Sequence, residues 1–272
     1  MRFRSHVARP FDLGLWSNRI LFALIGASAV AALVFWAEGE PLSVFWAPAH
    51  VFVFWAIARE VDPDRDLTAH LAGAGAGIWA LIGQPTPEIL AVGALVLATR
   101  VLLNSTGRRP LVSDLVVIGL FASAIAYTRV GWVGAVALAI AVYVDGRLAE
   151  GANTASVVTA GAASVGATIV ATAANAFDVK VVEVDPVLVT VAGVAAIMMI
   201  LRAPPEPWSL VDSKLKWRLD QGRLHGSRAL LAVTTFAITI LHGDEAERAT
   251  PLIALLVLGL VSSEIERLRR RV

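Results

Sequence analysis

The chain has 272 residues, of which 57% are hydrophobic, and its mean hydropathy is +0.71. The hydrophobic share lies well above the ~45–50% of an ordinary globular domain, which excludes a typical water-soluble protein. The chain has no cysteine and a net charge of +1. Disulfides, thiolate metal sites and cysteine nucleophiles are therefore excluded.

Ten apolar segments follow one another along the chain, and each is a candidate transmembrane helix. A helix needs ~20 residues to cross a ~30 Å hydrocarbon core, with ~17 tolerable, so several segments are at the short end. The segments are residues 20–37, 42–58, 67–83, 88–103, 110–128, 130–144, 154–176, 185–201, 226–241 and 249–263. The sequence predicts an all-α, polytopic integral membrane bundle of about ten helices, with 1–272 forming a single transmembrane domain.

The basic residues divide unevenly between the two sides of the membrane that these ten segments would cross. If the N-terminus is cytoplasmic, 20 of the 23 Lys and Arg lie inside, and only Arg129, Lys180 and Arg248 lie outside. Such a bias sets the orientation of membrane proteins. We expect both termini to be cytoplasmic, in the plasma (inner) membrane of a prokaryote. Loss of one hairpin, such as 110–144, keeps the alternation, so eight spans are the alternative.

Two segments carry small residues at every fourth position, which is typical of close helix contacts in membranes. These residues are Ala69, Gly73 and Gly77 in segment 67–83, and Ala160, Ser164, Thr168 and Thr172 in segment 154–176. We expect both helices in the centre of the bundle, and segments 20–37, 226–241 and 249–263 against lipid. Ser164 and Thr168 are candidates to line a pathway, and tight packing without a cavity is the alternative.

The longest connection is a cytoplasmic loop, 202–227, which begins with three prolines among residues 203–207. Val211, Leu215 and Leu219 would share one face of a helix flanked by cations. This pattern favours an interfacial helix on the inner leaflet. The alternative is a solvated connector.

The densest polar cluster is the cytoplasmic turn between the second and third segments. Carboxylates this close together are suited to Mg²⁺ and, through it, to a substrate phosphate. The candidate metal ligands are Asp62, Asp64, Asp66 and His70, the last two lying on one helix face. A structural role is the alternative, because a proline between Asp62 and Asp64 favours a turn and Asp66 is suited to cap the next helix.

Ionisable groups inside a membrane are costly, so they are functional candidates. His50 lies near the middle of the second segment, after Pro48, where an imidazole in a kinked helix would gate a path or relay a proton. The alternative is a histidine bonded to a neighbouring helix. Arg100 and Asp114 lie at similar depth and are predicted to form an ion pair, unless Arg100 reaches lipid phosphates instead.

These features favour a secondary transporter of a small solute or a lipid-linked metabolite. The pathway candidates are His50, Arg100, Asp114, Ser164 and Thr168. No catalytic set stands out, so we expect neither an enzyme nor a cofactor, and the expected partners are the bilayer and the substrate, with no nucleic acid. One alternative is an enzyme that uses Mg²⁺ at the aspartate-rich turn on a phosphorylated lipid. Another is a non-catalytic partner of a second membrane protein.

Overall fold

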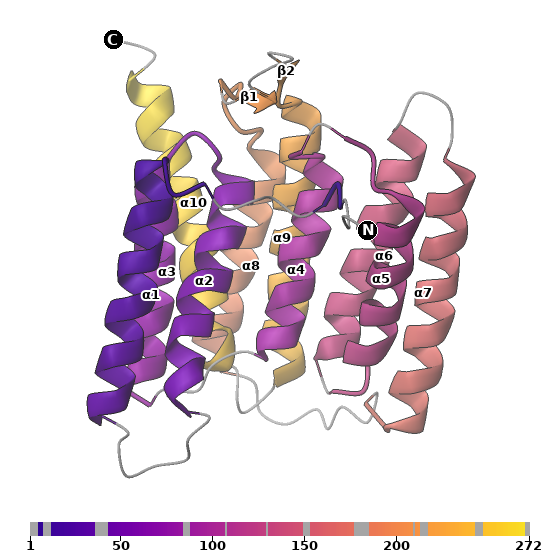
Figure 1. Ribbon diagram of the computed structural model, residues 1–272, viewed down its shortest axis with the longest axis horizontal. Helices are drawn as coiled ribbons and strands as arrows, with labels where there is room; N and C mark the ends of the chain where they lie inside the picture. The colour runs from indigo at the N-terminus through magenta and orange to yellow at the C-terminus, as the bar shows by residue number, and fades with distance from the viewer. Residues whose placement is uncertain are drawn as a thin grey trace.

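In the part of the chain that it describes, the computed structural model places ten helices side by side and adds one short β-hairpin. Successive helices run in opposite directions, so each helix finishes at the end of the bundle where the next one begins (Figure 1). The described residues are 5–7, 12–35, 43–83, 88–106, 108–128, 130–148, 153–176, 185–208, 210–212, 217–242 and 247–269.

Each helix lies within a few residues of a predicted apolar segment, so the helical bundle is confirmed. The elements are α1 (Trp16–Phe35), α2 (Ser43–Val61), α3 (Asp66–Leu81), α4 (Ile89–Leu103), α5 (Val112–Ile125), α6 (Gly131–Leu148), α7 (Thr154–Ala173), α8 (Pro186–Leu201), β1 (Leu210–Asp212), β2 (Trp217–Arg218), α9 (Gln221–His242) and α10 (Thr250–Arg269). Long apolar runs become helices because only a helix satisfies its own backbone hydrogen bonds without water.

Six helices are long and apolar enough to cross a membrane by length and composition, namely α1, α2, α6, α7, α9 and α10. The apolar helices α4, α5 and α8 are shorter, with 15, 14 and 16 residues. Helix α3 also has 16 residues. The fold is thus a helical bundle with several helices able to span a membrane, while ten spans and their orientation stay predictions.

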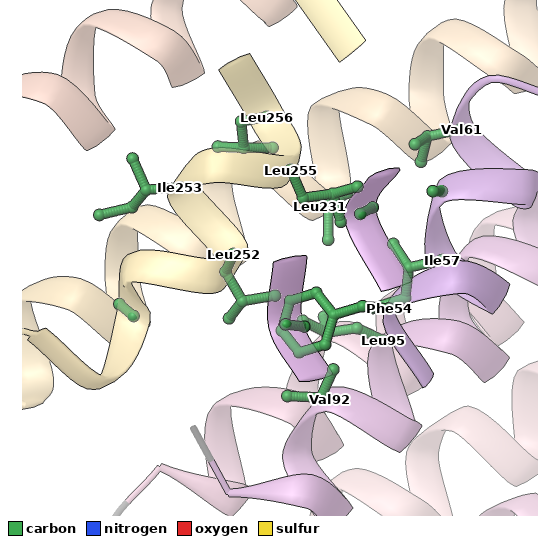
Figure 2. Close-up of a cluster of buried hydrophobic side chains, with 14 of the residues drawn as sticks. Phe54, Ile57, Val61, Val92, Leu95, Leu231, Leu252, Ile253, Leu255 and Leu256 are labelled. Atoms are coloured by element: carbon green, nitrogen blue, oxygen red, sulfur yellow. The ribbon is translucent and has the colours of Figure 1, made fainter. Parts of the chain in front are cut away.

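We divide the helices into two groups by their order in the chain. The terminal group combines the two ends of the chain, α1–α3 and α8–α10, and the internal group is α4–α7. One hydrophobic core lies in the terminal group and also includes residues of α4 and α6, such as Leu95 and Ala137. A second core lies in the internal group and includes Ala98 of α4. Figure 2 shows the first core, where Phe54 of α2 lies among side chains of α4, α9 and α10. The groups meet where α4 packs against α2 and α9, and where α6 packs against α9.

The small-residue stripe of α3 makes a close helix contact, as its spacing predicted, and the partner is α2. Among the described elements α3 packs only against α1, α2 and α10, so its predicted central position is wrong. A Cβ atom added to Gly73 would lie 2.8 Å from the carbonyl oxygen of Val51 and 3.1 Å from Cβ of Trp55. Ala69 and Gly77 on the same face are also buried. The two helices can approach this closely because glycine leaves no side chain between their backbones.

Helix α7 lies at the edge of the bundle, so its predicted central position is wrong. Among the described elements it packs only against α5 and α6. It buries alanines such as Ala163 and Ala167. Ser164 and Thr168 are exposed and donate hydrogen bonds within their own helix, to the carbonyl oxygens of Ala160 and Ser164, each at 2.8 Å. A hydroxyl that bonds its own helix needs no second helix.

The prediction that segments 226–241 and 249–263 face lipid is wrong. Helix α9 packs against α8, α4 and α6, and α10 packs against α8 and α3. Half of the apolar window of each helix is buried, against 22% of that of α1, whose predicted lipid-facing position stays a prediction. Helix α9 buries Arg228, Thr234 and Thr239, and a helix face with these groups is costly to expose to hydrocarbon.

The connection after α8 holds a hairpin where an interfacial helix was expected. Strand β1 pairs antiparallel with β2, and α9 begins at Gln221, earlier than predicted. The helix prediction is therefore wrong for the residues of both strands, while residues 209 and 213–216 lie outside the described part. The physical reason is that helix nucleation is unfavourable in so short a segment unless other elements support it.

Candidate functional site

Buried ionic groups gather at one end of the bundle. We call it the basic end: it holds the α2–α3 turn (residues 62–65), the last turns of α4, α6, α8 and α10, and the hairpin (Figure 1). Because successive helices alternate in direction, the described residues among the 20 Lys and Arg predicted to lie inside are all at this end. Arg248, which is predicted to lie outside, is at the opposite end. Its identity as the cytoplasmic end stays a prediction.

Two ion pairs at the basic end join the terminal group to the internal group. Glu60 of α2, which is 1% exposed, accepts a hydrogen bond from Nε of Arg100 of α4 at 2.9 Å. Arg223 of α9 donates to Oδ1 of Asp145 of α6 at 2.6 Å and to the carbonyl oxygen of Leu102 at 3.0 Å. The pairs are reciprocal, because each helix group supplies one acid and one arginine.

The predicted ion pair between Arg100 and Asp114 is wrong. Arg100 bonds to Glu60 and lies 3.5 Å from the carbonyl oxygen of Val7. The carboxylate of Asp114 accepts the N–H groups of His6, at 2.9 Å, and of Leu111, at 3.0 Å. The two side chains still line one cavity of about 310 Å³ between α4 and α5. Backbone N–H donors at the start of α5 satisfy Asp114 locally, which frees Arg100 for the acid on α2.

Sequence reasoning missed the acids Glu60 and Asp145 and the arginines Arg223 and Arg228. The two acids lie in the last turns of α2 and α6, at the end of the bundle where basic residues are expected. An acid in such a position was the feature of the sequence that could have identified them. Arg228 is 3% exposed and donates to the carbonyl oxygen of Gly259, at 2.9 Å, and to Oγ of Ser263, at 2.7 Å. In the sequence Arg228 stands only as one of the 20 basic residues of the inside set, because it lies at the start of the predicted segment 226–241.

The aspartates of the turn bond to separate protein partners. Asp62 is buried and accepts hydrogen bonds from Thr68, at 2.9 Å, and from Ser262, at 2.5 Å. Asp64 accepts the N–H of Trp208 at 3.1 Å. In this arrangement the carboxylates of the turn help to fix α3, α10 and the segment before the hairpin to one another.

Asp66 and His70 also have different partners, although they share a helix. Asp66 forms an ion pair with Arg59, and it is the first residue of α3, whose cap is Arg65, so its expected capping role is wrong. His70 donates from Nε2 to the carbonyl oxygen of Ser17 at 3.1 Å. Across the residues that the structure describes, no three His, Asp or Glu side chains lie close enough to hold a metal ion.

His50 lies inside the terminal group, 1% exposed. Its Nδ1 donates to the carbonyl oxygen of Trp46, one turn earlier, at 2.7 Å, and its ring stacks on Phe54 with centroids 6.2 Å apart. Helix α2 continues through Pro48. The imidazole is thus bonded within its own helix. The alternative to a gating role that the sequence offered was a bond to a neighbouring helix.

The opposite end of the bundle holds one notable acid. Glu88, which precedes α4, accepts a hydrogen bond from the hydroxyl of Thr128. Burial raises the pKa of Glu88, while the Thr128 hydrogen bond and the positive charge of Arg248 act in the other direction. Arg248 comes just before α10, so the charge that acts on Glu88 belongs to the terminal group.

Comparisons with known proteins give no further assignment: no family model, no curated protein and no solved structure matches the chain. The geometry of the basic end therefore carries the functional argument.

Proposed function

We propose that this protein is a multi-pass membrane transporter of a small solute, in which the terminal and internal helix groups move against each other. The observation that carries the proposal is the reciprocal pair of buried ion pairs, Glu60 with Arg100 and Asp145 with Arg223, between the two groups. Many transporters work by rocking one helix bundle against another around a site near the midplane.

Buried ion pairs suit such a movement better than they suit stability. Removal of two charges from water costs several kcal/mol per ion by rough estimates, so a buried pair adds little net stability. A buried charge that has lost its partner is far costlier, so the contact is either fully formed or fully opened to water. Apolar contacts between α4 and α9 leave no unpaired charge when they separate. The pairs would act as a latch that holds the basic end closed.

The latch can be tested because the chain has no native cysteine. Leu102 is 4% exposed, and a Cβ atom added to Gly226 of α9 would lie 3.7 Å from its side chain. We expect a Leu102→Cys probe to react slowly with a water-soluble maleimide. Glu60→Gln and Arg223→Gln should each speed the reaction roughly tenfold, the change for a ~1.4 kcal/mol shift of an opening equilibrium.

The matched control is Glu264→Gln. Glu264 forms ion pairs with Arg202, at 2.5 Å, and with Arg267, at 2.9 Å, but all three residues belong to the terminal group. It should leave the labelling rate of Leu102→Cys unchanged. Equal rates in all three variants would show that the cross-group pairs hold nothing closed.

Transport itself is tested with the same probe. Amino acids, sugars, organic acids and nucleosides are added to the reconstituted protein, and a substrate should change the labelling rate at Leu102→Cys because it binds the two states unequally. Uptake of that solute into proteoliposomes should then fall in Glu60→Gln. If no class alters the rate and none is taken up, the transport proposal fails.

A second candidate function has one observation in its favour. A cavity of about 390 Å³ lies between α3 and α10 beside the acidic turn, where Asp64, Asp66 and Glu266 meet apolar side chains such as Leu71 and Val261. Leu71 and Val261 are half exposed, so the cavity opens on the outer surface of the bundle. An enzyme acting on a phosphorylated lipid needs this kind of opening.

Magnesium distinguishes the two candidates. A cation that binds only the folded protein raises its melting temperature with increasing concentration. We expect no rise, because Asp62 and Asp66 already bond to Ser262 and Arg59. A Mg²⁺-dependent rise that disappears in Asp62→Asn would place the lipid enzyme first.

A further inference from the structure

A wide, open cavity lies on the surface of the basic end, away from the ion-pair latch. It measures about 770 Å³ and is bounded by the N-terminal segment (residues 5–7), the α4–α5 turn and the first residues of α5 and α7. Its described lining is His6, Arg108, Arg109, Pro110, Leu111, Asn153, Thr154 and Ala155. Two arginines and a histidine thus face a cavity to which no described acidic side chain contributes.

The walls of this cavity are fixed by hydrogen bonds. His6 donates from its N–H to Asp114 at 2.9 Å and from Nδ1 to the carbonyl oxygen of Arg109 at 2.8 Å. Thr106 donates to the carbonyl oxygen of His6 at 2.5 Å. The N–H groups of His6 and Leu111 both bond to Oδ2 of Asp114, so this acid anchors the wall of the cavity.

The charges and the helices favour an anion. Arg108 and Arg109 are exposed, so their guanidinium groups are accessible to a ligand from solution or from the lipid surface. Helix α7, 20 residues long, begins at the cavity and adds the positive end of its dipole. Arginine forks match phosphate oxygens in two parallel hydrogen bonds, which makes phosphate the best anion for this lining.

We propose that this cavity binds a phosphate group, carried either by an anionic phospholipid or by a soluble phosphate compound. The exposed Val112 of α5 and Val158 of α7 lie on the helices below the arginines and would contact the acyl chains of a lipid. The proposal is independent of transport, because none of the lining residues belongs to the latch.

The experiment compares wild-type protein with Arg108→Gln/Arg109→Gln in neutral detergent. Its probes are dioleoyl phosphatidic acid, dioleoyl phosphatidylcholine and pyrophosphate, each titrated while the melting temperature is followed. We expect a saturable rise with phosphatidic acid and with pyrophosphate, and a roughly tenfold or greater weakening of both in the variant, as the loss of a charge-assisted hydrogen bond predicts. Phosphatidylcholine should have a smaller effect.

The control Arg202→Gln/Arg218→Gln removes the same charge elsewhere on the basic end and should bind like the wild type. Arg108→Lys/Arg109→Lys keeps the charge without the fork, so it should bind with intermediate affinity and guards against misfolding of the glutamine variant. A response to phosphatidic acid alone supports a lipid headgroup, and a response to pyrophosphate alone supports a soluble phosphate. Equal binding by the glutamine variant and its control, or no binding at all, overturns the proposal.

Discussion

Helices α3 and α7 carry similar sequence patterns and occupy opposite kinds of position. In α3 the small residues at every fourth position, including Gly73, are buried against α2. In α7 the hydroxyl residues of the corresponding stripe, Ser164, Thr168 and Thr172, are exposed, and 28% of the apolar window is buried. The spacing of small residues alone therefore does not identify a helix interface.

The difference lies in the chemistry of the small residues. Glycine removes side-chain volume and lets two backbones touch, which only a second helix can exploit. Serine and threonine hydroxyls can bond the carbonyl four residues earlier in their own helix, as Ser164 and Thr168 do. The interface of α7 is instead its alanine face, with Ala163 and Ala167.

The largest effect is expected at Gly73. Gly73→Leu would place side-chain atoms against the carbonyl oxygen of Val51 and against Trp55, neither of which can move without shifting α2. We expect destabilisation above about 3 kcal/mol, the upper part of the range for overpacking. Size-exclusion chromatography and thermal unfolding of the purified protein in detergent measure it.

Gly161→Leu on α7 is the matched control for that change. A Cβ atom added to Gly161 would have no neighbouring atom within 4 Å. The same substitution should therefore leave the elution profile and melting temperature nearly unchanged. Comparable damage from both changes would mean that loss of glycine itself, and not contact with α2, causes the effect.

An intermediate effect is expected on the alanine face of α7. Ala167→Leu adds volume at a position that is 3% exposed in the core of the internal group. It should destabilise by about 1–3 kcal/mol, whereas Ser164→Leu on the exposed face should be tolerated. The reverse order of melting temperatures would show that the hydroxyl stripe is the interface after all.

The smallest effect is expected from the hydroxyls themselves. Ser164→Ala and Thr168→Val remove hydrogen bonds that both end within α7. Each should change stability by no more than about 0.5 kcal/mol, as for surface substitutions away from a specific feature. A larger loss of stability in lipid nanodiscs than in detergent would show that this face of α7 contacts lipid or another protein.

At the candidate site the sequence identified half of one ion pair. Arg100 stood out because a charge within an apolar segment is costly. Its partner Glu60 did not, because it lies beside Arg59 in a turn rich in charges. Asp114 was given the wrong partner, since depth along two helices says nothing about the rotation of either helix. His50 was correctly placed inside α2, but its bond to Trp46 within the same helix was not foreseen.

The sequence by itself determined the ten helices and their alternating direction, because apolar runs of this length must satisfy their hydrogen bonds internally and short loops leave little freedom. Only the tertiary structure decided that α9 and α10 return to pack on α2 and α3, and that α4 and α6 join the internal group to α9. It also decided which charges pair between the groups. The physical reason is that helix order and helix partners in a bundle depend on the shapes of whole faces, to which residues distant in the chain contribute, and a local pattern does not contain that information.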